Sequence, residues 1–141
     1  MQRSSDDPLA WRRMTAPTLG EIEALAADAY GRLPEGFRAL SDNLIIQVTD
    51  FPTEEVQDQM NVETEFDLLG LFQGVGLPFQ SASAPEQLPN MIWLYRRPIL
   101  DYWAEHEDSL SAIVTHVLVH EIGHHFGLSD ADIEAIEAGA D

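Results

Sequence analysis

The sequence predicts a small α+β domain in which one long helix packs on a face of a small mixed β-sheet. Three short apolar runs, separated by stretches rich in Gly, Pro and polar residues, have the length of β-strands. Residues 109–126 form a longer run that is apolar almost all round, so we expect a central helix there. The chain has 141 residues, of which 45% are hydrophobic, and this suits one domain with its own core.

The N-terminal part is predicted to be a flexible arm at residues 1–17, followed by a single domain at residues 18–141. The arm is polar and lacks the apolar run of a signal peptide. Thr18 and Glu21 have the spacing of a capping box, which predicts a helix from there to about Arg32. Its apolar stripe consists of Ile22, Leu25, Ala26, Ala29 and Leu33.

The middle of the chain alternates apolar runs with turn-forming residues, as strands and loops do. A short helix is expected at residues 53–60. Residues 77–90 contain three prolines with several serines and alanines, which predicts an irregular loop. Arg96-Arg97-Pro98 is expected to end the third strand, and residues 99–103 to form a helical turn. The predicted strands are residues 44–48, 68–73 and 90–95.

The C-terminal part is predicted to hold the central helix and a shorter one after it. Residues 105–108 are acidic and suit the start of a helix, where carboxylates meet the positive end of the dipole. Asp108 is the expected N-cap of the central helix. Residues 130–138 form an amphipathic helix with Ile133 and Ile136 facing inward. The residues of the central helix expected to be buried are Leu110, Ile113, Val114, Val117, Leu118 and Ile122.

The end of the central helix carries the pattern H-E-x-x-H-x-x-G-x-x-D, from His120 to Asp130. His120 and His124 lie one turn apart on one helix face, about 6 Å along the axis, so both imidazoles can bind one metal ion. Glu121 lies about 100° further round the helix, where a carboxylate can lean over the metal without binding it. This is the position of a general base that acts on a metal-activated water.

The third metal ligand is expected to be Asp130. Gly127 can adopt a left-handed conformation and end the helix, so that the chain turns back toward the histidines. Asp132 and Glu134 are rival carboxylates nearby. Three protein ligands leave one position open, as in catalytic zinc sites, and the absence of cysteine leaves only His and carboxylate ligands. The alternative is a core helix whose histidines merely face solvent, and His116 in particular is expected to make no metal contact.

The motif resembles that of small bacterial zincin-like metallopeptidases, a family once catalogued only as a domain of unknown function. Weaker supporting matches lie at residues 33–37 (LPEGF), 69–74 (LGLFQG) and 94–99 (LYRRPI), and the resemblance covers residues 18–138. It implies a minimal zincin-like fold and a zinc-dependent metallopeptidase with one Zn²⁺ per chain. In such a site Glu121 is the catalytic base, and the metal ligands are His120, His124 and Asp130.

The resemblance also implies a peptide or protein substrate. In zincins an edge strand near the metal helix pairs with extended substrate, and residues 68–73 are the candidate strand. Larger metzincins have a methionine turn and a C-terminal subdomain, whereas eleven residues follow Asp130 here and none is Met. The group that stabilises the oxyanion stays open among Tyr95, Tyr102 and Arg96. A metal-binding but non-catalytic interaction domain is therefore the main alternative.

The net charge of the chain limits the kinds of molecule that it is expected to bind. Seven arginines and no lysine stand against 25 acidic residues, which gives a net charge of −18. Such a charge repels phosphate, so nucleic acid is not an expected partner and a metal-dependent nuclease is the weakest alternative. No apolar run is long enough to cross a membrane. The lack of cysteine fits a cytoplasmic location, and the oligomeric state stays open.

Overall fold

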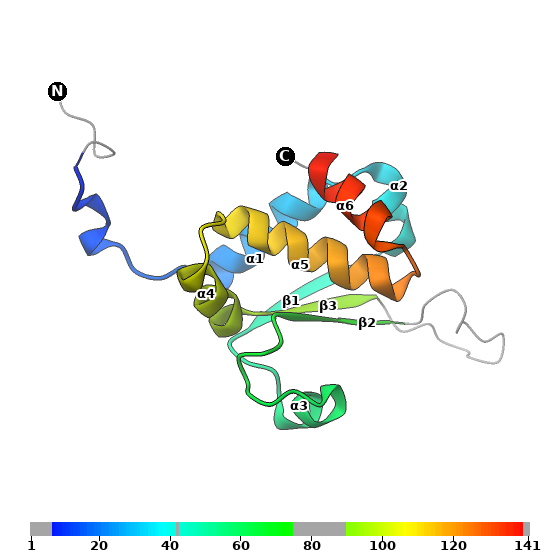
Figure 1. Ribbon diagram of the computed structural model, residues 1–141, viewed down its shortest axis with the longest axis horizontal. Helices are drawn as coiled ribbons and strands as arrows, with labels where there is room; N and C mark the ends of the chain where they lie inside the picture. Colours follow the sequence, from blue (N-terminus) through cyan, green and yellow to red (C-terminus); the bar gives the residue numbers. More distant parts are fainter. Residues whose placement is uncertain (1–6, 42, 75–89, 140–141) are drawn as a thin grey trace.

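The computed structural model describes residues 7–41, 43–74 and 90–139 and shows a small sheet covered by helices (Figure 1). The α+β class predicted from the sequence is confirmed. The strands are β1 (Ile45–Thr49), β2 (Gly70–Gln73) and β3 (Met91–Tyr95). The helices are η2 (Ala10–Arg13), α1 (Leu19–Gly31), α2 (Glu35–Arg38), η3 (Ala39–Ser41), α3 (Glu54–Met60), α4 (Arg96–Glu105), α5 (Leu110–His125) and α6 (Asp130–Gly139).

The sheet is mixed, with β3 in the centre, parallel to β1 and antiparallel to β2. Gly70 lies opposite Leu94, and the carbonyl of Leu69 accepts a hydrogen bond from Tyr95 N at 3.0 Å. Because alternate residues of an antiparallel strand bond to the partner, the backbone groups of Gly70 and Phe72 point away from β3. Within the described residues, β2 is thus an edge strand with backbone groups free to pair.

Helix α5 lies across one face of the sheet, between α1 and α6 (Figure 1). It packs on both α1 and β2, and Val114, Leu118 and Ile122 are completely buried. Ile113 and Val117 are also buried, whereas Leu110 is only partly buried against the same core. The prediction of a central helix is confirmed, because the apolar sides of α5 meet α1, the sheet and α6.

The N-cap of α1 is the predicted residue, whereas the N-cap of α5 differs from the predicted one. At α1, Glu21 N donates to Thr18 Oγ1 at 3.1 Å and Thr18 N donates to Glu21 Oε1 at 3.0 Å, so the capping box is confirmed. At α5 the N-cap is Ser109, whose hydroxyl accepts from Ala112 N at 3.1 Å. The prediction of Asp108 was wrong by one residue, because a serine caps as well as an aspartate does.

The segment after β3 is more helical than predicted. Strand β3 ends at Tyr95, directly before the arginine pair and Pro98, as predicted, but helix α4 spans Arg96–Glu105 and is longer than the helical turn expected at residues 99–103. Pro98 lies in the first turn of α4, where its missing N–H has no intrahelical partner to lose. A proline near a strand end therefore marked a helix start, and α4 brings Tyr102 toward α5.

The predicted arm and the predicted loop are only partly described. Residues 7–17 lead away from the body of the molecule and contain η2 (Figure 1). Residues 1–6 and 77–89, to which the remaining arm and loop predictions apply, lie outside the described residues. In the described part of the chain, no helix is long and apolar enough to cross a membrane.

Gly70 lets β2 approach α5 closely. A Cβ on this residue would lie 2.6 Å from Val117 Cγ1 and 3.0 Å from the carbonyl oxygen of Trp93. We expect Gly70→Ala to lower the free energy of unfolding by about 1–3 kcal/mol, because an overpacked contact forces the strand outward. Urea denaturation measures the change, and Gly31→Ala is the control because its Cβ would meet nothing within 4 Å. Equal stability of the two variants would contradict the close contact.

Candidate metal centre

The turn between α5 and α6 is built as the motif predicts. Gly127 has a φ of +80°, in the left-handed region that favours glycine. Its N–H donates to the carbonyl of His124 at 3.1 Å, and Leu128 N donates to the carbonyl of Gly123 at 2.9 Å. This pair of bonds is a Schellman motif, which ends α5 and sends the chain back along it. Ser129 then caps α6 through a hydrogen bond from Asp132 N at 3.1 Å.

Gly123 sets how closely α6 packs on α5. A Cβ at Gly123 would lie 2.9 Å from Ile133 Cγ1 and 3.0 Å from Ile133 Cδ1, so any larger residue would force Ile133 to move. Ile133 is completely buried at the contact. Two carboxylates of α6, Asp130 and Glu137, therefore lie beside the histidine face of α5.

The structure brings the predicted ligands together only in part. His124 lies beside Asp130, but in the described part of the chain the ligand atoms of His120, His124 and Asp130 do not all come within 4.8 Å of one another. His120 and His124 are one turn apart, with ring centroids 5.2 Å from each other. His124 Nε2 lies 3.1 Å from Asp130 Oδ1. This distance is that of a hydrogen bond or ion pair, and it is also close to the separation of about 3.3 Å between two ligand atoms bound at about 2.0–2.1 Å to one tetrahedral ion.

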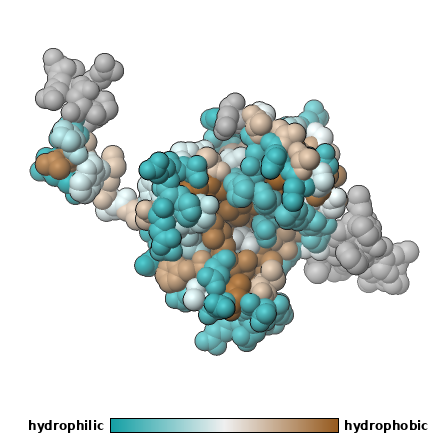
Figure 2. Space-filling view, viewed as in Figure 1, coloured by the Kyte–Doolittle hydropathy of each residue, from teal (hydrophilic) through white to brown (hydrophobic). Residues whose placement is uncertain are grey.

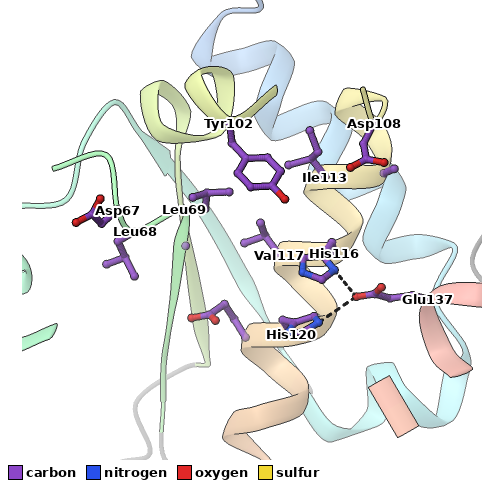
Figure 3. Close-up of a pocket in the computed structure, with 13 residues that line it drawn as sticks. Asp67, Leu68, Leu69, Tyr102, Asp108, Ile113, His116, Val117, His120 and Glu137 are labelled. Carbon is purple, nitrogen blue, oxygen red and sulfur yellow. Dashed lines mark ion pairs between the residues drawn. The ribbon is translucent and has the colours of Figure 1, made fainter. Parts of the chain in front are cut away.

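His120 faces a carboxylate outside the predicted ligand set, Glu137. Figure 3 shows His116 and His120 both turned toward it. Glu137 Oε1 lies 2.8 Å from His116 Nδ1 and 3.5 Å from His120 Nε2. Ligand atoms of these three residues all lie within 4.8 Å of one another. The only sequence signal for Glu137 is its spacing of four residues from Ile133, which puts both on one helix face.

The oxygen of Glu137 in this cluster lacks a hydrogen bond. Oε1 is buried and, in the described part of the chain, accepts from no donor, although two imidazole nitrogens lie near it. A buried carboxylate oxygen that accepts no hydrogen bond destabilises a fold by about 1–3 kcal/mol. A cation would satisfy it, and the imidazole and carboxylate donors at this face fit zinc.

Glu121 faces a cavity of about 510 Å³ between α5, Tyr102 of α4 and the segment that leads into β2. Figure 2 shows hydrophobic surface in the middle of this side of the molecule, bordered by hydrophilic side chains. Leu69 and Gly70 line the same cavity, so the edge strand and the carboxylate share one wall. Burial raises the pKa of Glu121, and the nearby His124 opposes this shift.

The three candidates for the oxyanion group differ in their surroundings. Arg96 is held by the carbonyl of Pro17 at 2.5 Å and by Asp50 at 3.1 Å. Tyr102 lines the cavity. Tyr95 is buried, and its pKa is raised, first by burial and then by the negative charge of Glu121. Tyr95 and Tyr102 therefore lie nearer to Glu121 than Arg96 does, and they are the better candidates for the group that stabilises the oxyanion.

The raised pKa of Tyr95 predicts its behaviour in alkali. A phenol with a folded-state pKa above its ordinary value stabilises the fold below pH 10, and this contribution is lost as the pH rises through the raised pKa. We expect the wild type to contain a tyrosine that ionises above pH 10 and that Tyr95→Phe lacks. Ultraviolet absorbance of tyrosinate during an alkaline titration measures this, and an unchanged late phase in Tyr95→Phe would contradict it.

One known protein family matches most of the chain. The model of the zincin-like metallopeptidase family matches residues 41–140. No curated protein matches the chain. The family match includes β1, β2, β3 and the motif helix, and a metallopeptidase family implies a metal ion and a peptide substrate.

Proposed function

Because the chain belongs to the zincin-like metallopeptidase family, we propose that it is a zinc-dependent peptidase. Glu121 is the general base in this proposal, and His120, His124 and Asp130 hold one zinc ion. The observation that carries it is the position of Glu121, directly after a ligand histidine and on the wall of a cavity that the edge strand also lines. When bound, zinc polarises the carbonyl of the substrate and makes a water more acidic.

The choice of Asp130 over its rivals is supported by contacts. Asp130 Oδ1 lies 3.1 Å from His124 Nε2. Asp132 is turned toward the start of α6, where its carboxylate accepts from Ser129 N at 3.4 Å. Glu134 is exposed and makes no contact with the histidines in the described structure. The left-handed turn at Gly127 supports the same choice, because it returns the chain beside His124.

The role of Glu121 follows from its surroundings. Its carboxylate makes no hydrogen bond or ion pair with the described residues, so it is free to accept a proton. Burial raises its pKa, which increases its affinity for that proton at neutral pH. The same group can then return the proton to the amine that leaves after bond cleavage.

The edge of β2 is the proposed site for the peptide backbone. The backbone groups of Gly70 and Phe72 point away from β3, and Gly70 lines the cavity that holds Glu121. An extended peptide can add to such an edge through main-chain hydrogen bonds, which are independent of its sequence. Side chains of the peptide then meet the apolar wall formed by Leu69 and Val117.

Zinc binding and peptide cleavage test the proposal together. At neutral pH the wild type should bind a first equivalent of zinc tightly and cleave members of a peptide library. Asp130→Ala should weaken the binding of this first equivalent by at least about tenfold and lose most cleavage. Asp132→Ala is the matched control and should keep both properties. Equal effects of the two substitutions would overturn the ligand assignment, and a zinc-loaded wild type that cleaves nothing would favour the interaction domain.

A further inference from the structure

We propose that the chain has a second position for a divalent cation, formed by His116, His120 and Glu137. It lies one helical turn before the zinc position proposed above for His120, His124 and Asp130, and the two positions share His120. The proposal concerns metal binding and is independent of peptidase activity. It goes beyond the HExxH motif, because neither His116 nor Glu137 belongs to the motif.

The spacing of the three side chains suits a common ion. Glu137 Oε1 lies 3.5 Å from His120 Nε2 and 2.8 Å from His116 Nδ1, on either side of the separation of about 3.3 Å for neighbouring ligands of tetrahedral zinc. The two imidazole rings are 3.9 Å apart and inclined by 38°. Small rotations of these rings suffice to direct both nitrogens at one ion.

By distance Glu137 and His116 form an ion pair, at 2.8 Å, but the contact is not a well-aligned hydrogen bond. An imidazolium that pairs with a carboxylate donates a hydrogen bond to it, and such charge-assisted bonds are short and well aligned. Here the buried Oε1 of Glu137 has two ring nitrogens within 3.5 Å but accepts a hydrogen bond from neither. A cation between the three groups supplies the missing partner of the oxygen.

The position is both rigid and accessible. Its ligands project from α5 and α6, which are locked together by the contact of Gly123 with Ile133. The side chain of His116 is 55% exposed, and all three ligands line the cavity of about 510 Å³. An ion can therefore enter from solvent without any movement of the helices.

Because the two positions share His120, they should differ in their affinity for zinc. When His120 binds zinc together with His124 and Asp130, the second position retains only His116 and Glu137. It should then be weak and fill only when zinc is in excess. When the first position is disabled, His120 is free and the second position has its full set of two imidazoles and one carboxylate.

A double variant of the full chain tests this inference. His124→Ala/Asp130→Ala removes two ligands of the first position and none of the second. Titration with zinc against a chromophoric chelator should still give a stoichiometry near one zinc per chain at saturation. Addition of His116→Ala should weaken this remaining site by at least about tenfold. Since His116 is half exposed, its replacement should leave the fold intact, which circular dichroism checks.

His106→Ala in the same double variant is the control, because His106 is exposed and contacts neither position. Retention of the remaining zinc in this control, with its loss in His116→Ala, is the expected result. A double variant that binds no zinc, or equal binding after both replacements, would overturn the second position. Loss of the tight zinc on His116→Ala alone would instead contradict the ligand set of the proposed function and leave the second position standing.

Discussion

Glu121→Gln should bind zinc as tightly as the wild type and lose peptidase activity by about 10²–10⁴-fold, the range for removal of a general base. Glutamine has the shape of glutamate but cannot accept the proton. Glu121 lies outside the group of histidines and carboxylates on the α6 side of α5, and it faces the cavity beside β2. The substitution should thus separate proton transfer from metal binding.

Two measurements on the same sample decide this prediction. Zinc affinity is measured by competition with a chelator, and cleavage is followed on the best substrate from a peptide library. Glu134→Gln is the matched control, because Glu134 is an exposed glutamate on α6, and it should leave both values unchanged. Full activity of Glu121→Gln would remove the general base from the proposal, whereas loss of zinc would make Glu121 a ligand.

The features that the sequence predicts well are those encoded locally. The capping box at Thr18 depends on two residues three positions apart, and the turn at Gly127 depends on one left-handed residue. The central position of α5 follows from apolar residues on nearly all its sides. His124 and Asp130 lie close to each other because of the same turn, since the chain reverses within six residues.

The features that the sequence does not reveal depend on contacts between elements. Glu137 lies 17 residues after His120 in the chain, and it reaches the histidines only because α6 crosses α5 at Gly123. The contact of His116 with Glu137, at 2.8 Å, depends on the same crossing, and nothing local distinguishes His116 from other helical histidines. The strand ends before Arg96 as predicted, but the sequence did not indicate that α4 begins at once and includes Pro98, because a proline can follow a strand or stand in the first turn of a helix.

Gly123→Val should lower both stability and zinc affinity, since both depend on the crossing of α5 and α6. A valine Cβ would lie within 3.0 Å of two carbon atoms of Ile133, in a core that has no room for it. Overpacking of this kind lowers the free energy of unfolding by about 1–3 kcal/mol. Displacement of α6 also moves Asp130 and Glu137 from the histidines, so zinc affinity should fall by at least about tenfold.

A double-mutant cycle with Ile133→Ala identifies the cause. Ile133→Ala alone should destabilise the zinc-free protein by about 2–5 kcal/mol, because it leaves a cavity in the core. In that background Gly123→Val should cost less than it does alone, since the valine occupies the vacated space. Urea denaturation without zinc measures this coupling separately from metal binding. If the changes in the free energy of unfolding were strictly additive, other contacts would hold α6 against α5. The turn at Gly127 alone would then position Asp130 and Glu137.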